Sequence, residues 1–471
     1  MCPTSPDPLP DAFLRDVETE LDATTRFHDP GECWSYGYDN SRRQNMPGLV
    51  VLATDHAEVA VLAGLCHRHR IPLTARGRGT GTTGAAVPEP GGVVLSLERM
   101  DRIIEMAPGD RYLVCEPGAT NQAIQEAAGD HGFFWAPDPT SAAFCTVGGN
   151  LAYNSAGPRA VKYGTPRENT LGLRAVTGNG GSIRTGVRTS KGVVGYDLTR
   201  LLIGSEGTLG IITEATLRLL PKPESTTTFK AVYRDMAAAA QAVSRIMAQP
   251  VTPSALEFID HRAIEMIRSH SDADLPEGAG ALLMIEVDGP AACLQAAAKA
   301  VADAAHGGDG AGLLSLDQAT EPADVAALWA TRKALSPALR QVAPKKINED
   351  VVVPVTRIPA LVSGLEELAS RHAITIVNFG HAGNGNIHVN LLVDPDKGDE
   401  LVRAWRCLDE VFALVLGLGG SLSGEHGVGL EKRDFVDREL DGESLALMHA
   451  IKAQFDPHGI LNPGKGFPIP T

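Results

Sequence analysis

The sequence lacks several features that would assign it to a specialised class of protein. No run approaches the roughly 20 apolar residues that a membrane-spanning helix needs. The seven cysteines are scattered and contain no Cys-x-x-Cys pair, which argues against an iron–sulfur cluster on this chain and against a disulfide scaffold. Basic residues are too few to balance the acidic ones. The formal net charge of −15 therefore argues against a nucleic acid or an anionic membrane as the main partner.

The first seven residues also lack the basic and apolar regions of a secretory signal, so we expect a cytoplasmic protein. The rest of the composition is ordinary for a soluble enzyme. The 471 residues are 43% hydrophobic and 21% charged, with room for two or three domains and a large core.

A glycine-rich stretch follows a strand-like lead-in at residues 71–75; it reads Arg76-Gly77-Arg78-Gly79-Thr80-Gly81-Thr82-Thr83-Gly84. Glycines without Cβ atoms let several backbone N–H groups point at one anion, and the threonine hydroxyls add donors. This composition favours a phosphate cradle, with a plain surface turn as the alternative. Residues 85–92 carry two prolines and two glycines and cannot begin a helix, and a strand is expected at Val93–Leu97. The Gly-x-Gly-x-x-Gly pattern therefore does not indicate a classical dinucleotide-binding turn.

Two later stretches are also rich in small and amide residues. Residues 136–157 would let a flat, polar ligand lie close to the main chain, with a covering Ω-loop as the alternative. Residues 202–213 lead towards a strand expected at Ala215–Leu220, closed by Pro221-Lys222-Pro223, which we interpret as a domain boundary. Helices are expected at Asp55–His69 and Asn121–Ala128, and this alternation of strands and helices indicates an α/β or α+β fold.

In order and spacing, these three stretches resemble the FAD-binding domain of the vanillyl-alcohol-oxidase/PCMH superfamily across about residues 48–222. The resemblance implies an α+β fold with a two-part PCMH-type FAD-binding domain, an α/β substrate cap domain and a helical C-terminal segment. It implies FAD without a covalent bond, because the cradle has no histidine and most similar sequences do not use the position of Cys145. The implied cofactor-binding residues are Arg76, Gly77, Arg78, Gly79, Thr80, Gly81, Thr82, Pro137, Asp138, Thr146, Gly148, Gly149, Asn150, Asn154, Gly157, Glu206, Gly210, Ile211, Ile212 and Asn462.

From residue 224 to about 430 the pattern changes to alanine-rich helices and isolated strands, which predicts a second α/β domain. Two histidines, His381 and His388, flank a glycine-rich turn, and Glu425 and His426 stand side by side in another glycine-rich loop. Two imidazoles and a carboxylate with open positions form a recognised arrangement for a divalent metal. Each histidine taken alone is more typical of a hydrogen-bonded core or turn residue, whereas the set together favours the metal site.

This half resembles the FAD-dependent D-2-hydroxyacid dehydrogenases, which include D-lactate, glycolate and D-2-hydroxyglutarate dehydrogenases. The matching motifs are G-H-x-G-x-G-N-x-H-x-N at 380–390, G-E-H-G-x-G at 424–429 and the ending at 455–465. The resemblance implies that His381, His388 and Glu425 bind zinc or manganese and that His426 is the catalytic base. It also implies four substrate-binding residues, Arg332, Ser336, Lys346 and Asn390.

Two of these assignments carry alternatives. Arg332 could be a solvated helix charge. The register near Lys346, ahead of a strand expected at Val351–Val355, is open by a residue or two. That register matters because relatives specific for dicarboxylates need an extra cation there.

The expected organisation is an N-terminal segment (1–47), the FAD-binding domain (48–222), the cap domain with the metal site (223–430) and a C-terminal segment (431–471) returning to the FAD domain. The implied reaction is oxidation of a D-2-hydroxy acid to the 2-oxo acid by hydride transfer to flavin N5. Alternatives are a flavin-dependent reductase, an alkyl-dihydroxyacetone-phosphate-synthase-like enzyme and a non-enzymatic flavin sensor. The electron acceptor (a quinone, an electron-transfer flavoprotein or a cytochrome) would lie on another chain, and the oligomeric state, a homodimer included, stays open.

Overall fold

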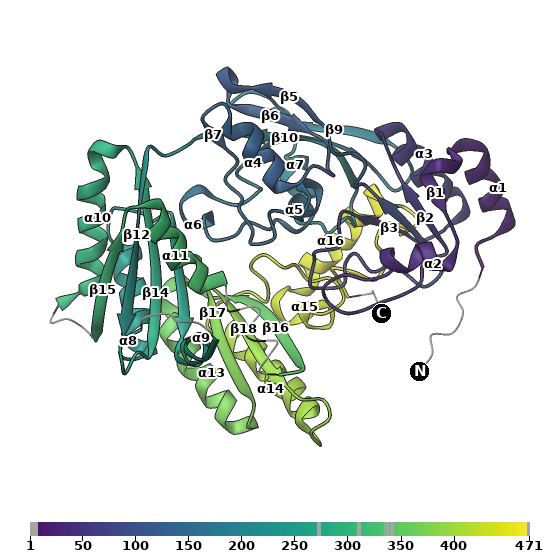
Figure 1. The fold of residues 1–471 in the computed structure, drawn as a ribbon. Helices are drawn as coiled ribbons and strands as arrows, with labels where there is room; N and C mark the ends of the chain where they lie inside the picture. The colour runs from purple at the N-terminus through teal and green to yellow at the C-terminus, as the bar shows by residue number, and fades with distance from the viewer. Residues whose placement is uncertain are drawn as a thin grey trace. The chain divides into compact units, whose positions relative to one another are not determined.

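The computed structural model describes residues 8–270, 275–308, 312–333, 335, 339 and 343–468. The chain forms two compact units. The first comprises Met1–Gly157, Gly164–Lys222 and Glu425–Thr471, and the second comprises Pro158–Tyr163 and Pro223–Gly424. Helices and strands are mixed in both, which confirms the α+β expectation (Figure 1).

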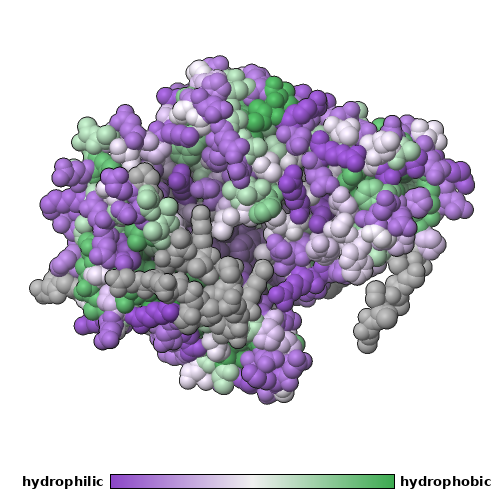
Figure 2. Space-filling model, in the orientation of Figure 1, coloured by the Kyte–Doolittle hydropathy of each residue, from purple (hydrophilic) through white to green (hydrophobic). Residues whose placement is uncertain are grey.

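No helix within the described residues is long and apolar enough to cross a membrane. The face drawn in Figure 2 is largely hydrophilic, with small and separated hydrophobic areas, as the excess of acidic residues leads one to expect.

The first unit begins with a small sheet of strand order β1-β2-β4-β3. β2 (Leu49–Leu52) and β3 (Leu73–Arg76) both run parallel to β4 (Val93–Ser96), whereas β1 (Arg26–Phe27) is antiparallel. Helices α1 (Asp11–Glu20) and α3 (His56–His69) pack on this sheet and bury its apolar side chains. The Asp55 carboxylate caps α3 by accepting from the N–H groups of Ala57 and Glu58, so the predicted start of this helix is confirmed.

A second sheet in the same unit is fully antiparallel, with strand order β5-β6-β10-β8-β9. Its strands are β5 (Ile103–Ala107), β6 (Tyr112–Cys115), β10 (Ile211–Arg218), β8 (Thr170–Val176) and β9 (Ser182–Gly186). The expected strand at Ala215–Leu220 was placed too late, since β10 already begins at Ile211 directly after the glycine-rich loop. Short pieces and helices complete the unit: α2 (Pro30–Cys33), α4 (Asn121–Gly129), β7 (Phe133–Phe134), α5 (Val147–Tyr153), α7 (Leu198–Leu202), β11 (Leu220–Pro221), α15 (Val436–Glu439) and α16 (Gly442–Phe455).

The second unit is built on one seven-stranded antiparallel sheet, ordered β15-β12-β14-β13-β17-β18-β16. The strands are β12 (Ser225–Tyr233), β13 (Ala255–Asp260), β14 (Ala281–Gly289), β15 (Leu313–Ala319), β16 (Lys345–Val352), β17 (Thr375–His381) and β18 (Asn386–Val393). Helices α8 (Met236–Ala248), α10 (Ala291–His306), α13 (Ile358–His372) and α14 (Glu400–Gly417) line the sheet in Figure 1. The unit also contains α6 (Ala160–Tyr163), α9 (His261–His270) and α11 (Pro322–Lys333).

The strand expected at Val351–Val355 was wrong. β16 instead covers Lys345–Val352, and it pairs with β18 along its whole length. Read alone, Lys-Lys-Ile-Asn-Glu-Asp is mostly charged and polar, so it looks like a solvent-exposed segment that precedes a strand. In the folded chain, Ile347, Glu349 and Val351 are buried on one face, while Asn348 and Asp350 turn to the other.

Candidate functional site

The glycine-rich loop joins β3 to β4 and contains no helix, as the prolines predicted. A Cβ atom on Gly77 would stand 2.4 Å from the Thr146 hydroxyl, and one on Gly81 would stand 2.7 Å from the Tyr153 hydroxyl. Gly79 has a φ of 64°. These glycines bring backbone N–H groups to places that a side chain would fill, which fits a loop that wraps a diphosphate.

The guanidinium of Arg76 lies against the loop, since a Cβ atom on Gly79 would stand 2.3 Å from its Nη2. This buried guanidinium donates to the backbone oxygens of Tyr38 at 2.6 Å and Ser35 at 3.3 Å. Arg78, in contrast, is exposed, and Thr80, Gly81 and Thr82 are partly exposed along the same loop.

A lysine that the sequence reasoning did not assign to the site contacts β3, the strand that leads into the loop. The buried ammonium of Lys465 donates to the Thr74 hydroxyl at 3.3 Å and to Asn462 Oδ1 at 3.2 Å. Asn462 in turn donates from Nδ2 to the backbone oxygens of Ala85 and Glu206. Burial lowers the pKa of Lys465 to about 8, since two neutral acceptors compensate poorly for lost hydration.

The stretch between residues 136 and 157 folds back on itself. Thr146 caps α5 by accepting from the Gly149 N–H, and Gly148 packs so closely that a Cβ atom would stand 2.7 Å from Pro117.

Asp138 N–H donates to Ala156 O, and the Asn154 amide oxygen accepts from Thr165 and from Arg167 N–H. Asn150 accepts from Asn121 at 3.4 Å, and Pro137 is buried beside them. The amides of Asn150 and Asn154 therefore already hold neighbouring chain segments.

Glu206 holds a distant loop. Both oxygens of its buried carboxylate accept backbone N–H groups, from Val428 and from Gly429 at 2.8 Å. Burial raises the pKa of Glu206, and these hydrogen bonds oppose that effect. Gly210, Ile211 and Ile212 follow at the start of β10, where the two isoleucines pair with β8.

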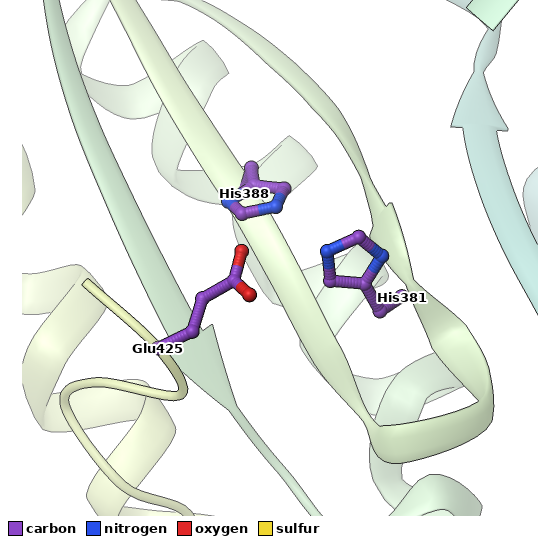
Figure 3. A group of neighbouring side chains, drawn as sticks. All are labelled: His381, His388 and Glu425. Carbon is purple, nitrogen blue, oxygen red and sulfur yellow. The ribbon is translucent and has the colours of Figure 1, made fainter. Parts of the chain in front are cut away.

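The three proposed metal ligands lie together (Figure 3). One ligand atom from each of His381, His388 and Glu425 falls within 4.8 Å of the others. His381 ends β17 and His388 lies in the neighbouring β18, and the register puts both side chains on one face of the sheet. Their rings meet edge to face with centroids 5.2 Å apart.

The peptide bond to Gly424 attaches Glu425 to this sheet. Gly424 N–H donates to the backbone oxygen and to the carboxylate of Asp350 in β16, both at 2.9 Å. Ser423 donates to the same carboxylate. Asp350 stands opposite His388 in the β16–β18 pairing, so the loop before Glu425 is tied to the strand beside the histidines.

Two further residues of the predicted site, His426 and Asn390, have different surroundings. His426 follows Glu425, with Nε2 3.8 Å from the Glu425 Oε1, and its backbone oxygen accepts from Thr83. Asn390 is fully buried and donates to Val377 O and His388 O. Its Oδ1 is buried without a hydrogen-bond partner in the described part of the chain, as expected of an acceptor kept for a ligand.

The strand register puts Lys346 on the same face of the sheet as Asn390, one ladder step further along. Lys346 stands opposite Leu392, whereas Asn348 stands opposite Asn390. Asn348 is thus the β16 residue beside Asn390, and the sequence offered no signal for it because the register was open. Arg332 belongs to α11, but its side chain lies outside the described residues, and Ser336 lies outside them altogether.

Comparison with known proteins finds a matching family for each half of the chain. The family described as "FAD binding domain" matches residues 47–186, and the family described as "FAD linked oxidases, C-terminal domain" matches residues 222–466. The chain is 39% identical to the glycolate oxidase subunit GlcD of Bacillus subtilis, covering 92% of each protein. It is 30% identical to D-2-hydroxyglutarate dehydrogenase of Stutzerimonas stutzeri, covering 97% of this chain and 99% of that one. The structure of p-cresol methylhydroxylase has the same fold, with a TM-score of 0.81, 18% identity and 98% of each chain covered.

Proposed function

The chain belongs to the FAD-linked D-2-hydroxyacid dehydrogenases, and from that premise we propose that it oxidises a small D-2-hydroxy monocarboxylate, such as D-lactate or glycolate, to the 2-oxo acid. The observation that carries the proposal is the gathering of His381, His388 and Glu425 within 4.8 Å in a chain with an FAD-binding domain. An FAD enzyme without metal-assisted chemistry would not need that donor set.

The residues take the following roles. The backbone of residues 77–84 binds the FAD diphosphate without a covalent bond to the protein, and bound FAD supplies the two-electron acceptor. His381, His388 and Glu425 would hold zinc or manganese, which would supply Lewis-acid chemistry to the substrate hydroxyl group. His426, next to Glu425, accepts the hydroxyl proton at a ring nitrogen, a role suited to neutral imidazole near pH 7. Arg332 anchors the substrate carboxylate.

The register of β16 supports a monocarboxylate. A second carboxylate on the substrate would need a cation near Asn390, but the neighbouring position holds the neutral Asn348. Lys346 stands two residues further along the strand, a backbone distance of about 7 Å. The similarity to a glycolate oxidase subunit points the same way.

Anaerobic mixing of the purified protein with D-lactate, L-lactate, glycolate and D-2-hydroxyglutarate tests the proposal. We expect the flavin absorbance to bleach with D-lactate or glycolate, and much more slowly after a chelator has removed the metal. His426→Ala should keep its FAD and lose the bleaching; undiminished bleaching would remove His426 from the role of base.

Reduction by NADPH with no response to any hydroxy acid would instead indicate the flavin-dependent reductase. Turnover of an acyl-dihydroxyacetone phosphate without a change of the flavin spectrum would indicate the synthase type. We propose that a separate quinone, electron-transfer flavoprotein or cytochrome reoxidises the flavin, which the rate of reoxidation by each candidate measures.

A further inference from the structure

Glu257 is a buried carboxylate to which the proposed reaction assigns no part. It lies on β13, directly opposite His381 in the β13–β17 pairing, and is 1% exposed. Its Oε1 is 2.5 Å from Nδ1 of His381, which makes a short hydrogen bond between the carboxylate and the imidazole. Sequence reasoning had no means of finding this pair, because 124 residues separate its members.

This hydrogen bond decides which ring nitrogen of His381 carries the proton. An ionised carboxylate can only accept, so the proton of a neutral His381 imidazole resides on Nδ1, and the lone pair of Nε2 stays available. In Figure 3, one ring nitrogen of His381 is directed towards His388 and Glu425 while the other is turned away. The carboxylate therefore both orients the ring and raises the basicity of the nitrogen that faces the cluster.

The charge of the side chains around the cluster also favours a divalent cation. Glu425 and Glu257 each bring one negative charge to a largely buried site, whereas neutral imidazoles bring none. The carboxylate of Asp350, buried opposite His388, adds a third negative charge, so this face of the sheet favours a multiply charged cation over a monovalent one.

We propose that Glu257 is a positioning residue, which holds His381 as the Nε2 ligand and thereby sets the affinity of the cluster for a divalent transition-metal ion. The inference rests on the proposed function for the cluster itself. It adds a fourth side chain, outside the ligand set, on which metal retention depends.

The experiment measures metal binding rather than turnover. Wild-type protein and Glu257→Gln are stripped with a chelator, checked for retained FAD by absorbance, and titrated with Zn²⁺ against a competing chelator. Gln keeps the size and an acceptor oxygen but removes the charge. We expect a 10- to 100-fold weaker affinity for Zn²⁺. With Co²⁺ instead, we expect a changed visible spectrum at wavelengths beyond the flavin bands.

Glu349→Gln is the matched control. Glu349 is a buried carboxylate of the same sheet, but it pairs with Val389 and so points to the face opposite His388. This variant should keep wild-type zinc affinity and the wild-type cobalt spectrum. Should Glu257→Gln fail to fold, Glu257→Asp replaces it, because drawing the carboxylate back by one methylene should also weaken zinc binding.

Equal zinc affinity and identical cobalt spectra in wild type and the Glu257 variant would overturn the inference. A wild-type protein that binds no divalent ion would overturn it together with the metal site. Weakened zinc binding in Glu257→Gln, combined with no flavin reduction by any hydroxy acid, would leave the inference standing and remove the proposed substrate class.

Discussion

The Gly157 N–H donates to Oε2 of Glu425 at 3.0 Å, across 268 residues of sequence. Gly157 ends the stretch predicted to line the flavin, and Glu425 is a proposed metal ligand. The hydrogen bond fixes one carboxylate oxygen of Glu425 by a backbone group that no substitution of a side chain can remove. Glu425 is thus oriented before any ion binds, which reduces the entropy lost on binding.

Replacing Glu425 by Gln should separate its hydrogen bond with Gly157 from its proposed role as a metal ligand. The amide oxygen can still accept from Gly157, so we expect the fold and the FAD content to be kept. The lost charge should weaken zinc binding at least tenfold and slow flavin reduction by substrate accordingly. Chelator competition and stopped-flow absorbance measure the two effects, and unchanged zinc affinity would contradict the ligand assignment.

Gly157 itself should not tolerate a side chain. Its φ is 77°, and a Cβ atom would stand 2.3 Å from the Asp138 backbone oxygen. We expect Gly157→Ala to lower the free energy of unfolding by about 1–3 kcal/mol. Thermal unfolding of the FAD-loaded protein measures this, with Gly109→Ala as the control, because no atom lies within 4 Å of that Cβ position.

The glycine-rich loop should lose FAD when Gly77 gains a methyl group. A Cβ atom there would stand 2.4 Å from the Thr146 hydroxyl, so the loop and the start of α5 must move apart. We expect Gly77→Ala to raise the Kd for FAD at least tenfold while the secondary structure is kept. Gly64→Ala on α3, where the added methyl group meets no atom within 4 Å, should leave the Kd unchanged. Fluorescence of released FAD reports both values.

FAD binding should weaken in alkaline solution through Lys465. Its folded pKa is lowered to about 8 from an ordinary 10.5, so the apo protein loses this buried charge as the pH rises above 8. Because the pKa of Lys465 is lower in the folded apo protein than in the unfolded chain, the buried ammonium decreases the free energy of unfolding below pH 8. This destabilisation disappears as the pH rises from about 8 to 10.5. A diphosphate beside the ammonium favours the charged form. The Kd for FAD should therefore rise with pH above 8, by up to about tenfold per unit.

Lys465→Met supplies the comparison for that titration. It should bind FAD more weakly at pH 7 and show a flat profile between pH 8 and 10, measured by equilibrium dialysis. A wild-type profile that is equally flat would remove Lys465 from the diphosphate site.

Substrate size should respond to Asn348. Placing a cation beside Asn390 by Asn348→Lys should raise kcat/KM for D-2-hydroxyglutarate relative to D-lactate by about tenfold or more, because a second carboxylate then finds a partner. An unchanged ratio in Asn348→Lys would argue against substrate contact at this position.

Local patterns in the sequence predicted much of the fold. Asp55 caps the helix that its spacing indicated, and the prolines after the glycine-rich loop led to β4 rather than to a helix. Such features depend on neighbouring residues and are readable from the chain alone. β16 was misplaced because its polar alternation gains meaning only from the strand beside it.

By itself, the sequence determined the glycine-rich loop, the residue types of a metal site and the kind of reaction that they suit. Only the tertiary structure decided that His381 has Glu257 as its partner, that Asn348 rather than Lys346 stands beside Asn390, and that Glu206 holds the loop after His426. The physical reason is that side chains alternate along a strand. Pairing with strands that are distant in the sequence therefore sets which face they occupy and which groups they meet.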